Sequence, residues 1–176
     1  MPLEFIYGVG CLVVGGIWLI KTLCFTSPPA PSSSPPSSLP RRMSFTSYIL
    51  VDGSFPEKVK VNSPIINILL QFKNLPTPEQ IAENCKRLLF YDRFRCACLR
   101  NSRGEFEFVE CDVNILKNHV STLEVDSEEE LLVEVDRINS TDIGGYNDRP
   151  LWIFHRIVNT GQGQSGILMR IHHVIG

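Results

Sequence analysis

Residues 150–176, PLWIFHRIVNTGQGQSGILMRIHHVIG, carry the clearest strand pattern in the chain. Aromatic and β-branched residues from Trp152 to Val158 predict one strand, and the apolar run from Ile167 to Ile171 predicts a second. The polar, glycine-rich segment 159–166 between them has the composition of a hairpin loop. We therefore expect a β-hairpin whose second strand leads directly into two adjacent histidines.

These histidines are His172 and His173, and they are expected to point in opposite directions. Side chains alternate between the faces of a strand, so His173 should share a face with Met169, and His172 with Arg170. A neutral imidazole, with an ordinary pKa near ~6.5, can accept a hydroxyl proton at neutral pH and act as a general base. A structural role, with each ring bonded to the backbone, is the more common fate of such a pair. The spacing alone leaves both interpretations open.

Pro150-Leu151-Trp152 stands about twenty residues before His172-His173-Val174-Ile175-Gly176. This combination resembles the bifunctional wax ester synthase and acyl-CoA:diacylglycerol acyltransferase family, whose members carry a Pro-Leu-Trp element and then a His-His-x-x-x-Asp-Gly motif. The resemblance makes His173 the general base and His172 a supporting residue. It marks Pro150, Leu151 and Trp152 as substrate or motif residues, with core packing the expected role of the tryptophan.

The resemblance implies an α+β fold. This would be the N-terminal half of a CoA-dependent, chloramphenicol acetyltransferase-like acyltransferase, with a mixed sheet covered by helices and a membrane helix before it. The implied enzyme is an O-acyltransferase that moves a fatty acyl group from acyl-CoA to a long-chain alcohol or diacylglycerol, in wax ester or triacylglycerol synthesis. Acyl-CoA is a co-substrate, so no bound cofactor is expected, and no residue is assigned to CoA binding.

Gly176 occupies the third x of the histidine motif, and in the family the second half of the fold would follow it. We therefore expect this chain to be an inactive N-terminal fragment of the enzyme. The alternative is a non-catalytic, membrane-tethered binding or regulatory fragment. A peptide-condensing or phenolic acyltransferase half would share the histidines but not the Pro-Leu-Trp element. The segments Asp92-Arg93-Phe94-Arg95 and His119-Val120 resemble shorter elements of the same family.

Composition and charge exclude several other classes of function. The 176 residues include 17 Lys and Arg against 19 Asp and Glu, with no polybasic run, so no nucleic-acid partner is expected. The sequence has no G-x-S-x-G nucleophile motif and no phosphate-binding loop. Cys96-Ala97-Cys98 lacks a second pair of ligands, which predicts no metal site and reduced, buried thiols in a cytosol-facing domain.

Residues 1–25 are expected to anchor the chain in a membrane. The charge-free run Phe5–Ile20 would span about 24 Å as a helix, and about 31 Å if the helix continued to Phe25. A secretory signal peptide and a buried helix are the alternatives. Lys21 and the arginine pair at 41–42 follow the run, which predicts a cytosolic C-terminal side, with the endoplasmic reticulum as the expected membrane.

A Pro- and Ser-rich linker, residues 26–42, is expected to separate this anchor from a globular domain at 43–176. Two helices are predicted to begin at the capping sequences Thr77-Pro-Glu-Gln and Ser127-Glu-Glu-Glu. The order of elements predicts an α+β layer in which helices cover one side of a mixed or mostly antiparallel sheet. The first helix should reach about Phe90 and the second Asn139-Ser140. Further strands are expected at Tyr48–Val51, Ile65–Phe72, Phe94–Leu99 and Phe106–Val109, with a turn at Asn101–Gly104.

Overall fold

The computed structural model describes residues 41–43, 64–144, 148–161 and 163–175. The predicted membrane helix, residues 26–40 of the predicted linker and the predicted strand Tyr48–Val51 lie outside these residues. Within the described part of the chain, no helix has the length and apolar character needed to cross a bilayer. The short strand β1 (Arg41–Arg42) occupies the last two positions of the range predicted as linker.

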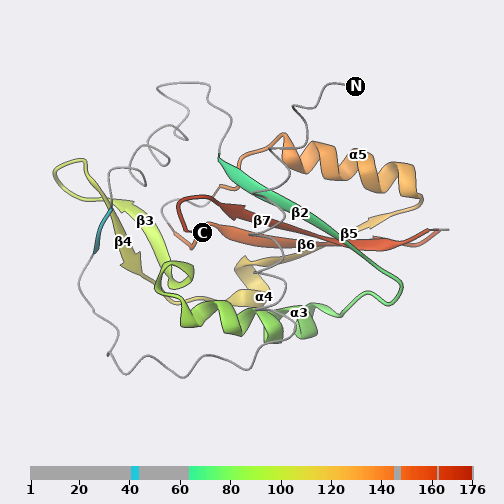
Figure 1. Cartoon of the computed structure of the whole chain (residues 1–176), viewed down its shortest axis with the longest axis horizontal. Coiled ribbons are helices and arrows are strands. Elements are labelled where there is room, and N and C mark those ends of the chain that lie inside the picture. The colour runs from blue at the N-terminus through green and yellow to red at the C-terminus, as the bar shows by residue number, and fades with distance from the viewer. Residues whose placement is uncertain (1–40, 44–63, 145–147, 162, 176) are drawn as a thin grey trace, which may run out of the picture.

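A four-stranded sheet forms the centre of the fold, in the order β2-β7-β6-β5 (Figure 1). The predicted hairpin is confirmed as β6 (Trp152–Asn159) and β7 (Ser165–His172), which pair antiparallel. The predicted strand β2 (Ile65–Phe72) is also confirmed and pairs antiparallel with β7 along its whole length. Strand β5 (Val120–Val125) pairs parallel with β6, so the sheet is mixed, as predicted.

Helices lie on both faces of this sheet, which corrects the prediction that they would cover one side. The helix α3 (Pro78–Cys85) and the short α4 (Ile115–Asn118) lie below the sheet in Figure 1, and α5 (Glu128–Asn139) lies above it. The reason is in β7, which is buried at every residue after Ser165 and therefore needs cover on both faces. Ile167, Met169 and Ile171 join the core under α3. Leu168 joins the core under α5.

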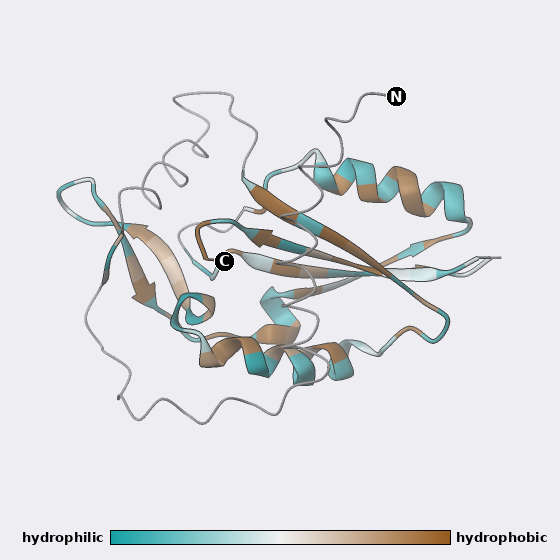
Figure 2. Cartoon of the chain, viewed as in Figure 1, coloured by the Kyte–Doolittle hydropathy of each residue, from teal (hydrophilic) through white to brown (hydrophobic). Residues whose placement is uncertain are grey.

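The helix termini follow the predicted capping chemistry with one difference. At α3, Thr77 Oγ1 accepts the N–H of Gln80, and the Gln80 side chain accepts the N–H of Thr77, which completes the predicted box. At α5, Ser127 Oγ accepts the N–H of Glu130, but the Glu130 carboxylate accepts the N–H of Asp126, one residue earlier than the box requires. Both α3 and α5 show alternating apolar and polar patches in Figure 2.

The first predicted helix continues beyond α3 in a tighter form. The chain forms 3-10 helices at η1 (Lys86–Phe90) and η2 (Asp92–Arg95), so the strand predicted from Phe94 starts later, as β3 (Cys96–Arg100). Strand β4 (Phe106–Glu110) follows the predicted turn, in which Gly104 has φ 77°, a value that favours glycine. Strands β1, β4 and β3 form a second, three-stranded sheet.

Candidate functional site

The histidine pair lies at the end of β7, and the two rings are in opposite environments. His172 is the last residue of the strand and is completely buried. His173 is the first residue of the turn that follows, and it is exposed. The pairing of β7 with β2 ends at His172. Strand alternation therefore predicts the direction of the His172 ring, whereas the turn sets the direction of His173.

The ring of His172 supports the turn that carries His173. Its Nδ1 accepts the N–H of Val174 at 3.2 Å, so the neutral ring carries its proton on Nε2. Burial lowers the pKa of His172 from 6.5 to about 4, in spite of the opposing attraction of Asp142. The ring is therefore neutral at pH 7, the state that this hydrogen bond requires.

Two further backbone bonds fix the same turn. The N–H of His173 donates to the carbonyl of Pro64, at the entry to β2, over 2.7 Å. The N–H of Ile175 donates to the carbonyl of His172 over 3.1 Å. Val174 and Ile175 are buried in the core, while His173 faces outward. The turn therefore exposes the imidazole of His173 on a backbone that is fixed by hydrogen bonds and by the buried side chains of Val174 and Ile175.

The Pro-Leu-Trp element packs directly beside this turn. Pro150 is buried, and Leu151 and Trp152 have no exposed surface. The carbonyl of Leu151 accepts the N–H of His172 over 2.9 Å, which joins the element to the last residue of β7. The indole Nε1–H of Trp152 donates to the carbonyl of Phe94 over 3.1 Å. These residues are core and scaffold of the site, and none of the three is placed to touch a ligand from outside.

A second buried histidine lies on the other side of Trp152. The rings of His119 and Trp152 stack with centroids 3.9 Å apart and 17° between their planes. Nδ1 of His119 donates to the carbonyl of Trp152 over 2.7 Å, and burial lowers the pKa of His119 to about 4. Its Nε2 is buried, with no hydrogen-bond partner among the described residues. The resemblance at His119-Val120 therefore marks a residue that packs against the Pro-Leu-Trp element.

The remaining histidine, His155, shares a face of β6 with Ile157, which packs in the core under α5. Nδ1 of His155 lies 2.7 Å from the hydroxyl of Ser121, on neighbouring strands β6 and β5. Burial lowers the pKa of His155 to about 4 as well, with Arg170 acting in the same direction. Of the four histidines, then, His119 and His172 are buried and His155 is partly buried, all three with a pKa lowered to about 4, and His173 is the exposed one.

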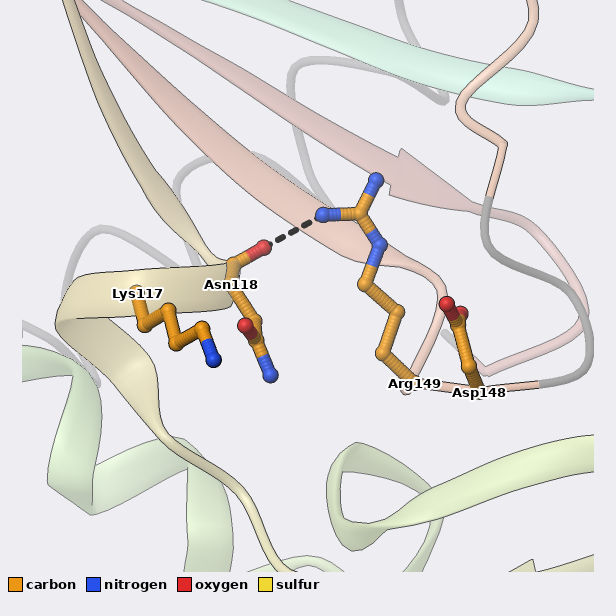
Figure 3. Close-up of a pocket in the computed structure, with 4 residues that line it drawn as sticks. All are labelled: Lys117, Asn118, Asp148 and Arg149. Carbon is orange, nitrogen blue, oxygen red and sulfur yellow. Dashed lines mark hydrogen bonds between the residues drawn. The ribbon is translucent and has the colours of Figure 1, made fainter.

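A polar pocket of about 350 Å³ is lined by Lys117, Asn118, Asp148 and Arg149. Figure 3 shows Lys117 and Asn118 on one wall, at the end of α4, and Asp148 and Arg149 on the other. The guanidinium of Arg149 donates to the carbonyls of Asn118 and Ile143, so it fixes the approach to β6. Within the described ranges, no group of three or more His, Cys, Asp or Glu side chains is arranged to hold a metal ion.

Solved structures with a similar fold include a wax ester synthase/diacylglycerol acyltransferase and several condensation domains. A wax ester synthase/diacylglycerol acyltransferase from Marinobacter aquaeolei VT8 matches with a TM-score of 0.56 and 17% identity, covering 77% of this chain and 33% of that protein. The starter condensation domain of rhizomide synthetase RzmA matches with a TM-score of 0.56 and 13% identity, covering 78% and 33%. The first condensation domain of the calcium-dependent antibiotic synthetase matches with a TM-score of 0.55 and 13% identity, covering 78% of this chain and 34% of that protein.

These similarities establish the fold. The chain has the α+β fold of the matched part of this acyltransferase and of these condensation domains. The chain spans about a third of the length of each of these proteins. No family model and no curated protein sequence matches the chain.

Proposed function

We propose that the protein is an O-acyltransferase, with His173 as its general base, of which this chain supplies the N-terminal half of the fold. The observation that carries the proposal is the contrast between the histidines: His173 alone is exposed, on a turn fixed by His172 and Pro64. A base must reach its substrate, and a ring whose pKa is about 4 is a poor proton acceptor near pH 7, as is the case for His172.

The proposed reaction needs one base and no covalent intermediate on the protein. The imidazole of His173 takes the hydroxyl proton of the acceptor alcohol as the oxygen attacks the thioester carbonyl carbon of acyl-CoA. The carbon–sulfur bond of the resulting tetrahedral intermediate then breaks. The departing thiolate takes the proton from the imidazolium, so the products are the ester and free CoA, and the neutral base is restored.

The proposed acceptors are long-chain alcohols and diacylglycerol, in wax ester or triacylglycerol synthesis. The support is the pairing of the Pro-Leu-Trp element with the histidine turn, which the backbone joins at Leu151 and His172. An N-terminal membrane anchor, with this domain on the cytosolic side of the endoplasmic reticulum, would bring the site to such apolar substrates. Acyl-CoA and the membrane are accordingly the proposed partners.

A condensation activity, in which an amine or alcohol attacks a different acyl thioester, is the second candidate. It is favoured by the similarity to two condensation domains, whose TM-scores of 0.55 and 0.56 equal that of the wax ester synthase within 0.01. The two candidates share the base and differ in the acceptor. Thin-layer analysis of lipids from cells that express the protein separates them, because only the first produces wax ester or triacylglycerol.

The exposure of His173 also bears on whether this chain works alone. A site that transfers an acyl group must exclude water from the thioester, and the turn presents His173 to solvent. We therefore expect the purified 176-residue chain to be inactive without a second lobe to cover the turn. Acyl transfer by that chain alone would contradict this expectation. Binding of acyl-CoA without turnover would support the non-catalytic alternative.

The test of the base is His173→Ala in the protein expressed from its complete coding sequence. We expect kcat to fall by about 10²–10⁴-fold, the usual contribution of a positioned base, with an unchanged thermal unfolding midpoint. The matched control is His172→Asn, whose side-chain oxygen can accept the Val174 N–H in place of Nδ1. The control should lose much less activity. Unaltered turnover in the His173→Ala protein would refute the proposal.

A further inference from the structure

The carbonyl of Val174 receives a hydrogen bond from a distant part of the chain. Nη1 of Arg93 donates to it over 3.0 Å, across a separation of 81 residues. The other bonds that hold this turn come from His172, the last residue of β7, and from Pro64, the residue before β2. Arg93 instead belongs to η2, at the base of the three-stranded sheet. In Figure 1 the end of β7 lies on the side of the molecule that faces this smaller sheet.

We propose that Arg93 is a positioning residue for His173, and that Trp152 of the Pro-Leu-Trp element acts on the turn through it. This inference rests on the acyltransferase function proposed above. It gives the arginine a task that its exposed position would not suggest, because a surface cation usually contributes little.

The element reaches the turn by two routes. In the first, the carbonyl of Leu151 accepts the N–H of His172, which fixes the start of the turn. In the second, the indole of Trp152 donates to the carbonyl of Phe94, the residue that follows Arg93. Phe94 is buried, and its ring lies 6.2 Å from the indole of Trp152, so η2 is fixed against the tryptophan. Arg93 then reaches from this fixed backbone to the carbonyl of Val174.

The guanidinium also lies over an aromatic ring. Its central carbon lies 5.4 Å from the centroid of the Phe108 ring, a distance typical of cation–π contact. Phe108 is buried in β4, between β3 and β1. A planar guanidinium can lie over a ring and donate in its own plane at the same time, whereas the ammonium of a lysine is a point charge. The geometry therefore calls for arginine at this position.

The alternative use of an exposed arginine beside a proposed acyl-CoA site is to bind a phosphate of CoA directly. The two roles predict different kinetics. A positioning residue acts on the reacting geometry, so its loss lowers kcat with little change in KM. A phosphate-binding residue acts on the affinity, so its loss raises KM for acyl-CoA with little change in kcat. A result of the second kind would overturn the proposal.

The first experiment measures amide hydrogen exchange in the 176-residue chain and does not depend on activity. For Arg93→Ala we expect the protection of the Val174 and Ile175 amides to fall about tenfold, the effect of losing one hydrogen bond to a charged group. The matched control is Arg100→Ala, which removes a guanidinium 4.6 Å from the Phe106 ring in the same sheet. The control should leave both amides protected. Unchanged exchange in Arg93→Ala would overturn the proposal.

The second experiment uses the protein expressed from its complete coding sequence. Arg93→Ala should lower kcat about tenfold with unchanged KM for acyl-CoA, and Arg93→Lys should restore only part of the loss. Full rescue by lysine would contradict the role of the planar guanidinium. The exchange result and the His173→Ala result are independent. If the amides lose protection but His173→Ala keeps full turnover, the anchoring by Arg93 stands and the acyltransferase function fails.

Discussion

Acid should destabilise this domain well above the pH at which its carboxylates are protonated, because of the two histidines that are completely buried. Burial lowers the pKa of His119 and of His172 from 6.5 to about 4. A group with a depressed pKa in the folded state binds fewer protons there than in the unfolded chain between pH 6.5 and 4. Its full contribution to stability is therefore present above pH 6.5 and is lost as the pH falls towards 4.

The magnitude follows from the two pKa values of each ring. Between pH 7 and 5, the unfolded chain gains most of a proton per ring and the folded chain gains almost none, which costs about 2 kcal/mol for each histidine. His119 and His172 together should then remove about 4 kcal/mol of stability, a large share of the roughly 5–15 kcal/mol typical of a domain. The pKa of His155 is lowered in the same direction, so its loss adds to theirs.

The assay is urea unfolding followed by circular dichroism, at several pH values from 7 to 5. The wild-type chain is compared with the His119→Asn/His172→Asn double variant. Asparagine does not titrate, but its amide can donate to the Trp152 carbonyl at position 119 and accept the Val174 N–H at position 172. The double variant should keep most of its stability at pH 7 and lose about 4 kcal/mol less between pH 7 and 5.

A glutamine pair provides the control for shape. His119→Gln/His172→Gln also removes both titrating rings, but its amides extend beyond the Nδ1 positions and lose the two hydrogen bonds. This variant should be less stable than the asparagine pair at every pH and have the same flattened slope. The reasoning is refuted if the wild type and the asparagine pair lose the same free energy of unfolding between pH 7 and 5.

Other predictions concern packing, capping and thiol chemistry. Trp152→Phe removes the donor to the Phe94 carbonyl and part of a buried ring, so the free energy of unfolding should fall by about 2–4 kcal/mol in urea unfolding. Thr77→Ala removes the cap of α3 and should cost about 1 kcal/mol in the same assay. Cys85 and Cys98 are buried, which raises the pKa of each thiol to about 12. Both should resist thiol reagents at pH 8 in mass spectrometry until urea unfolds the chain.

The hairpin and the helix starts could be predicted because their signals are local. Period-2 alternation and a glycine-rich loop define β6 and β7, and a hydroxyl followed by Gln or Glu three residues later defines the start of α3 and of α5. These patterns need no knowledge of the rest of the fold. The end of α3 was less well defined, because apolar spacing does not distinguish an α-helix from the tighter turns of η1.

Strand β5 was missed because its inward face is partly polar. Leu123 and Val125 face the core under α5 at alternate positions, but Ser121 takes the third inward position. Its hydroxyl is satisfied by Nδ1 of His155 on the neighbouring strand, a partner 34 residues away. Without knowledge of that partner, the sequence Val-Ser-Thr-Leu-Glu-Val appears only weakly amphipathic. Its β-branched content was the signal that could have found it.

The sequence placed the proposed site residues on the hairpin, but it could not predict their contacts. The order of the sequence places Pro-Leu-Trp and the histidines on paired strands, and the structure joins Leu151 to His172 as that pairing requires. The contributions of Arg93 and Pro64 arise from segments that the sequence separates from the turn by 81 and 109 residues. Such contacts depend on the packing of whole elements, which periodicity does not encode.

The position of β7 in the middle of the sheet also determines when β2 can pair during synthesis of the chain. Strand β2 pairs with β7 along its length and, within the described residues, with no other strand. About 90 residues separate the end of β2 from the start of β7, which takes a ribosome about 5–20 s to translate. During that interval Ile65–Phe72, an uncharged and largely apolar segment, has no neighbour to bond. Holdase chaperones should therefore bind the nascent protein at this segment and release it once Ser165–His172 has emerged.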